Sequence, residues 1–186
     1  MCLAFAWVAV SMTTVIRILP ALLALIAGIT DWRSRRIPNW LTVPAAVIGI
    51  AVNAWLRGRA GAKDSLLGLG LGLLLLLPFV LLRSLGAGDW KLVGALGAFL
   101  GPGNLITVLF ATVVVAGLMA LVLVIWKGRL MRTLKNIGRL LAALFSFHLP
   151  GEELTLDDPK SAKVPFGVAV AIAVIVYTAR QVLGFL

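Results

Sequence analysis

The hydrophobic and polar positions divide this chain into long apolar runs separated by short polar segments. The apolar runs cover about 13–30, 40–56, 65–82, 89–101, 104–126 and 164–183. A helix needs about 20 apolar residues to cross the hydrocarbon core of a bilayer. The pattern therefore predicts an all-α, polytopic membrane bundle of about six transmembrane helices. The fourth run is short and ends at Gly101-Pro102-Gly103, which we interpret as a turn.

The segment 127–148 has a different pattern. Apolar residues recur at helical spacing with basic residues between them, at Leu130, Leu134, Ile137, Leu141 and Leu144. This spacing is typical of an amphipathic helix that lies on a membrane surface. An ordinary basic interfacial helix is favoured over a lid for an incoming substrate. The acidic stretch 152–158 that follows is interpreted as a solvated loop without chemistry.

Composition supports a membrane protein. Hydrophobic residues make up 61% of the 186 residues, whereas soluble domains are about 45–50% apolar. We expect one integral-membrane domain over residues 1–186, with a cytoplasmic loop at about 127–163. One cysteine and one histidine cannot build a Cys/His zinc site, so neither a metal nor a cofactor is expected.

The distribution of positive charge predicts the orientation in the membrane. The net charge is +10, but the basic residues lie between the apolar runs, which favours contact with anionic lipid over nucleic acid. Twelve basic residues follow the first, third and fifth spans. The other side of the membrane carries only four, which are Arg57, Arg59, Lys63 and Arg180. The positive-inside rule then places both termini outside and these loops in the cytoplasm.

Two aspartates at the edges of apolar runs are the strongest candidates for chemistry. The chain has only 7 Asp and Glu residues, and Asp31 and Asp89 are separated by two predicted crossings, which return the chain to the same face. An acid at a membrane edge is costly, so it indicates function. Two neighbouring carboxyl groups can share a proton, and one then acts as general base on water while the other acts as general acid. The pair titrates as a unit, so the sequence does not say which aspartate has which role.

The residues beside the aspartates fit this chemistry. Gly86 and Gly88 permit close approach of a substrate backbone, and Ile37-Pro38 sets the start of the second span. Lys91 either tunes the field of the site or anchors the fourth span at the interface. A structural alternative exists for each aspartate, since Asp89 could be only a helix cap and Asp31 could pair with a nearby arginine. Their joint occurrence on one face makes the catalytic interpretation the stronger one.

At these residues the chain resembles the prepilin peptidase family, the GxGD-type intramembrane aspartyl proteases that process type IV pilins. The first family motif is matched by Asp31, Arg33, Arg36, Ile37, Pro38 and Asn39, and the second by Gly86, Gly88, Asp89, Lys91 and Leu92. Gly97, Gly101-Pro102 and Val164-Pro165-Phe166-Gly167 also resemble the family. Presenilin-like proteases share only the Gly-x-Gly-Asp element and are a weaker match.

The resemblance implies an aspartic endopeptidase of the bacterial inner membrane whose active site faces the cytoplasm. Its substrates would be prepilins or pseudopilins, which carry a short basic leader before an apolar helix. Long members of the family have a cysteine-rich N-terminal extension and also N-methylate their product. This chain has no cysteine pairs and places Asp31 directly after the first span. It looks like a short, peptidase-only form as found with Flp/Tad pili, and methyltransferase activity is predicted to be absent. The oligomeric state is left open.

Two other functions are compatible with acids in a membrane protein. A small proton-coupled transporter would carry its acids nearer the membrane midplane than Asp31 and Asp89. A non-catalytic pilus-assembly protein would have the same motifs without hydrolysis.

The remaining small and aromatic residues have structural interpretations. Gly68 and Gly72 are predicted to form a helix-packing face, and Gly94, Gly97 and Gly101 to bring the fourth span against the first. The six tryptophans are interpreted as an interfacial belt, at Trp7, Trp32, Trp40, Trp55, Trp90 and Trp126.

Overall fold

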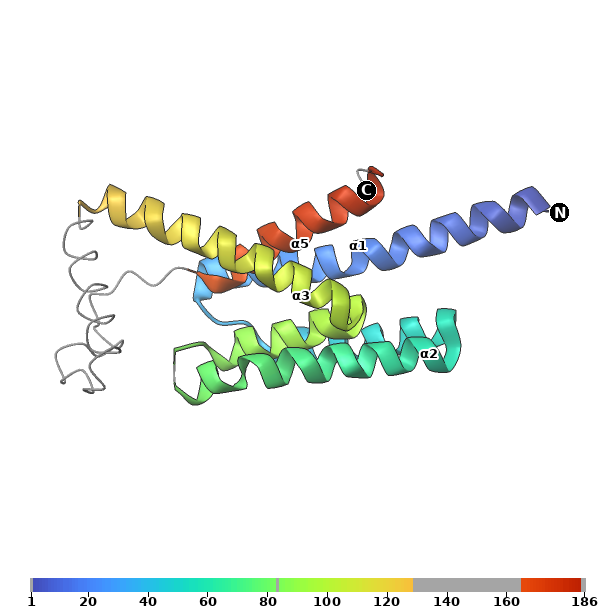
Figure 1. Cartoon of the computed structure of the whole chain (residues 1–186), viewed down its shortest axis with the longest axis horizontal. Helices are drawn as coiled ribbons and strands as arrows, with labels where there is room; N and C mark the ends of the chain where they lie inside the picture. Colours follow the sequence, from blue (N-terminus) through green and yellow to red (C-terminus); the bar gives the residue numbers. More distant parts are fainter. Residues whose placement is uncertain (1, 83, 129–164, 185–186) are drawn as a thin grey trace. The chain divides into compact units, whose positions relative to one another are not determined.

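The computed structural model describes residues 2–82, 84–128 and 165–184. These residues form helices α1 (Cys2–Ser34), α2 (Asn39–Leu81), α3 (Ala87–Trp126) and α5 (Phe166–Val182), and no strand occurs among them (Figure 1). The predicted all-α class is therefore confirmed. The predicted amphipathic helix beyond residue 128 and the acidic stretch lie outside the described residues.

The predicted second and third spans are two helices that meet at a kink and together carry the label α2, and the fourth and fifth meet in the same way in α3. Each bend is a glycine with positive φ, a conformation that L side chains rarely adopt. Gly58 has φ 58° and ψ −143°, and Gly101 has φ 73° and ψ 174°. The predicted boundaries at 57–63 and 101–103 are therefore present, but each is reduced to a kink at one glycine, Gly58 or Gly101, where two helices meet directly. Each of the two helices has two arms, and Figure 1 shows α2 turning back on itself.

Both α2 and α3 are long and apolar enough to cross a membrane. Large apolar side chains lie on the surface rather than in the core, for example Val47, Leu81 and Phe110. Extended apolar surface of this kind marks contact with lipid. The structure and the composition together indicate a membrane protein. Six crossings remain a prediction.

The chain divides into two compact units. The first contains residues 1–115 and 165–186, and the second contains residues 116–164. All the contacts described below lie within the first unit. Its core is built from buried residues of α1, the start of α3 and α5, including Ala24, Leu92, Leu96 and Val174.

Glycines bring the first arm of α3 against the second arm of α2. Gly68 faces the carbonyl of Gly97, and a methyl group at Gly94 would lie 2.7 Å from Leu73 Cδ2. The predicted packing role of Gly68 and Gly72 is confirmed. The partner predicted for Gly94, Gly97 and Gly101 was wrong, because these residues face α2 and not α1. The second arm of α2, which directly precedes α3 in the sequence, carries glycines at matching positions, whereas α1 does not.

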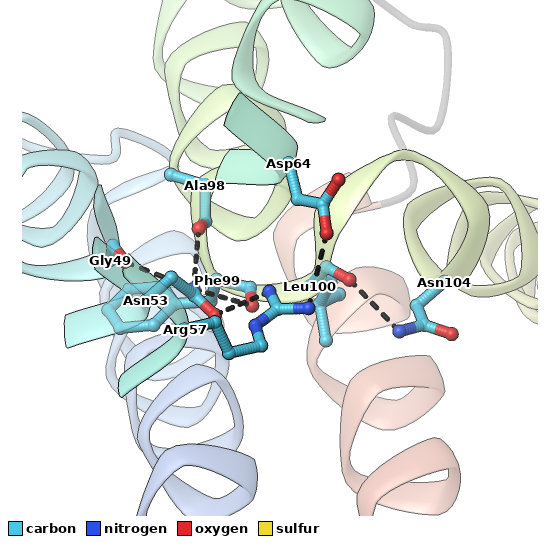
Figure 2. A network of polar contacts seen from close by, with 8 residues as sticks. All are labelled: Gly49, Asn53, Arg57, Asp64, Ala98, Phe99, Leu100 and Asn104. Carbon is cyan, nitrogen blue, oxygen red and sulfur yellow. Dashed lines mark hydrogen bonds and ion pairs between the residues drawn. The ribbon is translucent and has the colours of Figure 1, made fainter. Parts of the chain in front are cut away.

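A network of polar contacts links the region of the Gly58 kink in α2 to the region of the Gly101 kink in α3 (Figure 2). Pro102 has no N–H, so the carbonyl of Ala98 lacks the donor that a regular helix would supply. Asn53 Nδ2 donates to Ala98 O at 3.1 Å and to Phe99 O at 3.2 Å. Arg57 donates to Asn53 Oδ1 at 2.8 Å and pairs with Asp64 at 3.2 Å. We call Asn53, Arg57 and Asp64 the Asn53 network.

Candidate active site

Asp31 lies in the last turn of α1, on the buried side of the helix. The helix ends three residues later, and Arg35 adopts a positive φ of 50° while its N–H donates to Asp31 O at 2.8 Å. The side chain of Asp31 is only 7% exposed. The sequence placed Asp31 at the edge of the first span, and the structure places it inside the helix that forms this span.

Asp89 lies in the first turn of α3, directly after the two motif glycines. The N–H of Trp90 donates to Gly86 O at 3.2 Å, which begins the helix. Asp89 Oδ2 lies beside Gly86, where an added methyl group would meet it at 3.1 Å. The Asp89 carboxyl group also accepts a hydrogen bond from the Gly86 backbone, so Asp89 fills the capping role that we considered from sequence. Its other carboxyl oxygen, Oδ1, is buried and has no hydrogen-bond partner among the described residues.

Two contacts bring the motifs together. A methyl group at Gly88 would lie 2.9 Å from Ile37 O, so only glycine allows this approach. Lys91 Nζ donates to Asn39 Oδ1 at 3.0 Å. Ile37 is buried, and Pro38 precedes the first residue of α2 with φ −74° and ψ 144°. Ile37 and Pro38 thus set the backbone of the segment that contacts Gly88 of the second motif.

A third segment joins the site at the start of α5. The N–H of Gly167 donates to Asp31 Oδ2 at 2.8 Å. The sequence analysis did not name Gly167 as a site residue. Its signal was the resemblance of Val164-Pro165-Phe166-Gly167 to a family motif. Nothing in the spacing could show that this motif contacts Asp31, which is 136 residues away.

The electrostatics of the site involve the two aspartates and not the arginines. A Coulombic interaction links the carboxyl groups of Asp31 and Asp89. Within the described ranges the one ion pair is Arg57–Asp64, so Asp31 is not paired with an arginine there. Arg33, Arg35 and Arg36 are exposed. The alternative in which an arginine neutralises Asp31 is therefore not what the structure shows.

Two other predicted neighbours can now be placed. Lys91 donates a hydrogen bond to the first motif. This contact adds a third role, a link between the two motifs, to the field effect and the interfacial anchor predicted from the sequence. Trp32 is 71% exposed, as an interfacial belt requires. Trp90 is half-buried and its Nε1 donates to Leu73 O at 2.6 Å, so it also packs within the protein.

The described residues contain no group of three or more His, Cys, Asp or Glu side chains that could hold a metal ion. The arrangement offers two carboxyl groups, one of them with a buried free oxygen, beside backbone glycines. These groups suit general acid–base chemistry on a bound water.

A comparison with known protein families identifies the family of this chain. No curated protein and no solved structure matches the chain significantly. The model of the type IV leader peptidase family matches residues 17–121, a range that includes both aspartates and their motifs. The chain belongs to the type IV leader peptidase family and is a peptidase of that general class.

Proposed function

We propose that this protein is an aspartic endopeptidase that removes the leader peptide from type IV prepilins or pseudopilins, with Asp31 and Asp89 as its catalytic residues. The observation that carries the proposal is the convergence of the two motifs. Gly88 packs on Ile37, Lys91 bonds to Asn39, and the two carboxyl groups interact electrostatically. The family match adds the reaction class.

The proposed reaction is hydrolysis of a peptide bond without a covalent intermediate. One aspartate takes a proton from water, and the resulting hydroxide attacks the scissile carbonyl carbon. The other aspartate gives its proton to the carbonyl oxygen. Collapse of the tetrahedral intermediate then breaks the C–N bond, and the amine leaves with a proton from the pair. The unpartnered Oδ1 of Asp89 supplies a polar atom that water or substrate would satisfy.

The proposed orientation follows from the charge pattern. The six crossings would be α1, the two arms of α2, the two arms of α3, and α5. The exposed Arg33, Arg35 and Arg36 beside Asp31 support a site at the cytoplasmic face of the inner membrane, as the positive-inside rule predicts. Anionic lipid is the expected neighbour of these arginines. A prepilin fits this depth because its leader is basic and its following helix is apolar.

The direct test is cleavage of a co-expressed prepilin by the wild type, Asp31→Asn and Asp89→Asn. We expect cleavage by the wild type alone. Mass spectrometry of the mature pilin should show an unmethylated N-terminus, because we propose that this chain has no methyltransferase activity. Cleavage by either asparagine variant at the wild-type rate would refute the dyad, and methylation by this chain alone would refute the peptidase-only assignment.

A further inference from the structure

The contact between α5 and Asp31 has a chemical cause at the end of the helix. The first N–H groups of a helix have no partner within it. Pro165 precedes α5, and its side chain supplies no capping hydrogen bond. The N–H of Gly167 is instead satisfied by Asp31 Oδ2, at 2.8 Å. Asp31 therefore caps α5 from a different helix.

The space around this hydrogen bond admits only glycine. A methyl group at Gly167 would lie 2.9 Å from both Asp31 Cβ and Asp31 Oδ2, which is closer than real Cβ contacts. Any larger residue must move the carboxyl group or the start of α5. The same helix pair has a second close approach one turn away, where a methyl group at Gly28 would lie 2.8 Å from Ala171 Cβ. That contact involves no carboxyl group.

The hydrogen bond engages only one oxygen of Asp31. Among the described residues no hydrogen bond engages Asp31 Oδ1. A carboxyl group held through Oδ2 has its rotation fixed, and Oδ1 is left for the second aspartate and the water. Catalysis requires that such groups be held close to their productive geometry.

We infer that Gly167 is a positioning residue for the reaction, and that its N–H fixes the side chain of Asp31 while its missing side chain makes room for it. This inference rests on the proposed function, because it assigns Gly167 a role in the same site. Gly167 meets the site through its hydrogen bond to Asp31, so it acts through Asp31.

The first test compares Gly167→Ala with Gly28→Ala in the full-length protein, reconstituted in bilayers with a purified prepilin. Both variants add one methyl group to the same helix pair, but only Gly167→Ala meets the carboxyl group. We expect kcat to fall about 10²-fold for Gly167→Ala, with KM nearly unchanged, because a misplacement of about 1 Å has an effect of this size. When the two variants lose the same thermal stability, Gly28→Ala should lower kcat severalfold at most. Equal losses of kcat in the two variants would overturn the inference.

A second variant covers the case in which Gly167→Ala does not fold. Incorporation of glycolic acid at position 167 replaces the N–H by an ester oxygen and adds no volume. We expect this ester variant to lose kcat while KM is retained. Wild-type kcat in the ester variant would show that the hydrogen bond does not position Asp31.

A third measurement separates this inference from the proposed function, because it needs no activity. The thermal midpoint is measured for Gly167→Ala and Gly28→Ala, each with Asp31 and with Asp31→Gly, which removes both the carboxyl group and the Cβ that the added methyl group would meet. The penalty of Gly167→Ala should shrink in the Asp31→Gly background, and that of Gly28→Ala should not. Equal penalties in both backgrounds would overturn the inference, whereas absence of cleavage by the wild type would overturn the proposed function alone.

Discussion

The two ends of the first arm of α2 place an amide and a carboxyl group in different situations. Near Asn53 the carbonyl that Pro102 deprives of its helical donor receives one from Asn53, and the oxygen of the Asn53 amide accepts from Arg57. Near Asn39, about 21 Å away along the helix at 1.5 Å per residue, Asp89 Oδ1 is buried and has no partner among the described residues. Thr42 Oγ1 and Ser65 Oγ are also buried without a partner among the described residues, but a carboxyl oxygen is the costlier group to leave unpaired, so Asp89 needs a reason. We infer from this contrast that the Asn53 end serves stability and that, under the proposed function, the aspartate end serves chemistry.

The contrast predicts that substitutions at the aspartate end reduce activity more than stability. Gly88→Ala places a methyl group 2.9 Å from Ile37 O and separates the two motifs. We expect cleavage to fall by about 10²-fold or more, because the aspartates lose their relative position. The control is Gly117→Ala in the same helix, where an added methyl group meets nothing within 4 Å. The rate of prepilin cleavage by purified protein measures both, and a Gly88→Ala enzyme as active as Gly117→Ala would contradict this role for Gly88.

Substitution of Asn53 should have the opposite profile. Asn53→Leu leaves the carbonyl of Ala98 unsatisfied in a buried position and removes the acceptor for Arg57. The free energy of unfolding should fall by roughly 1–3 kcal/mol, the usual cost of an orphaned buried group. Cleavage per folded molecule should change little. Thermal unfolding in detergent measures the loss, and Asn104→Leu, which removes only an exposed bond to Leu100 O, is the control.

If Asn53→Leu abolished cleavage while leaving the thermal midpoint unchanged, the division between the two ends would be wrong.

Lys91 should have a moderate effect, since it joins the motifs through one exposed hydrogen bond. Lys91→Met should lower kcat by up to about tenfold, because a single hydrogen bond contributes roughly 0.5–1.5 kcal/mol. Asn39→Ala should have a similar effect, and the double variant should be no worse than either single variant. Additive losses would show that Lys91 acts on the site by another route.

The smallest effect is expected for the exposed Arg57–Asp64 ion pair. The two side chains are 50% and 46% exposed, so the pair is largely screened by solvent. Asp64→Asn should lower the free energy of unfolding by less than about 1 kcal/mol. This loss should shrink further at high salt in a thermal unfolding series. A loss of unfolding free energy as large as that of Asn53→Leu would show that the ion pair supplies most of the stability of the Asn53 network.

The sequence predicted the parts of this structure that depend on local pattern. Apolar runs gave the helical segments, and paired motifs gave Asp31 and Asp89, because a polar group in an apolar segment stands out. It did not show that two helices meet directly at Gly58 and at Gly101, since a glycine in a polar or Pro-containing segment also fits a longer loop. It also assigned Gly94 and Gly97 to the wrong partner, because small residues indicate close packing without saying against which helix.

Long-range contacts account for the other omissions. Asn53 was not singled out from the sequence, and its role follows from the proline in α3 that creates its acceptor. Gly167 was known only as part of a motif, and its role depends on the approach of α5 to α1. Neither contact has a signature in the spacing of either segment alone.

The central claim is that Asp31 and Asp89 act as one catalytic unit, and non-additivity tests it most directly. The rate of prepilin cleavage would be measured for purified wild type, Asp31→Asn, Asp89→Asn and the double variant. Residues that act as a unit lose nearly everything when one member is removed. We predict that each single variant loses at least about 10²-fold in rate, and that the double variant is no slower than the singles. Losses that multiply in the double variant, or a single variant that cleaves like the wild type, would contradict the claim.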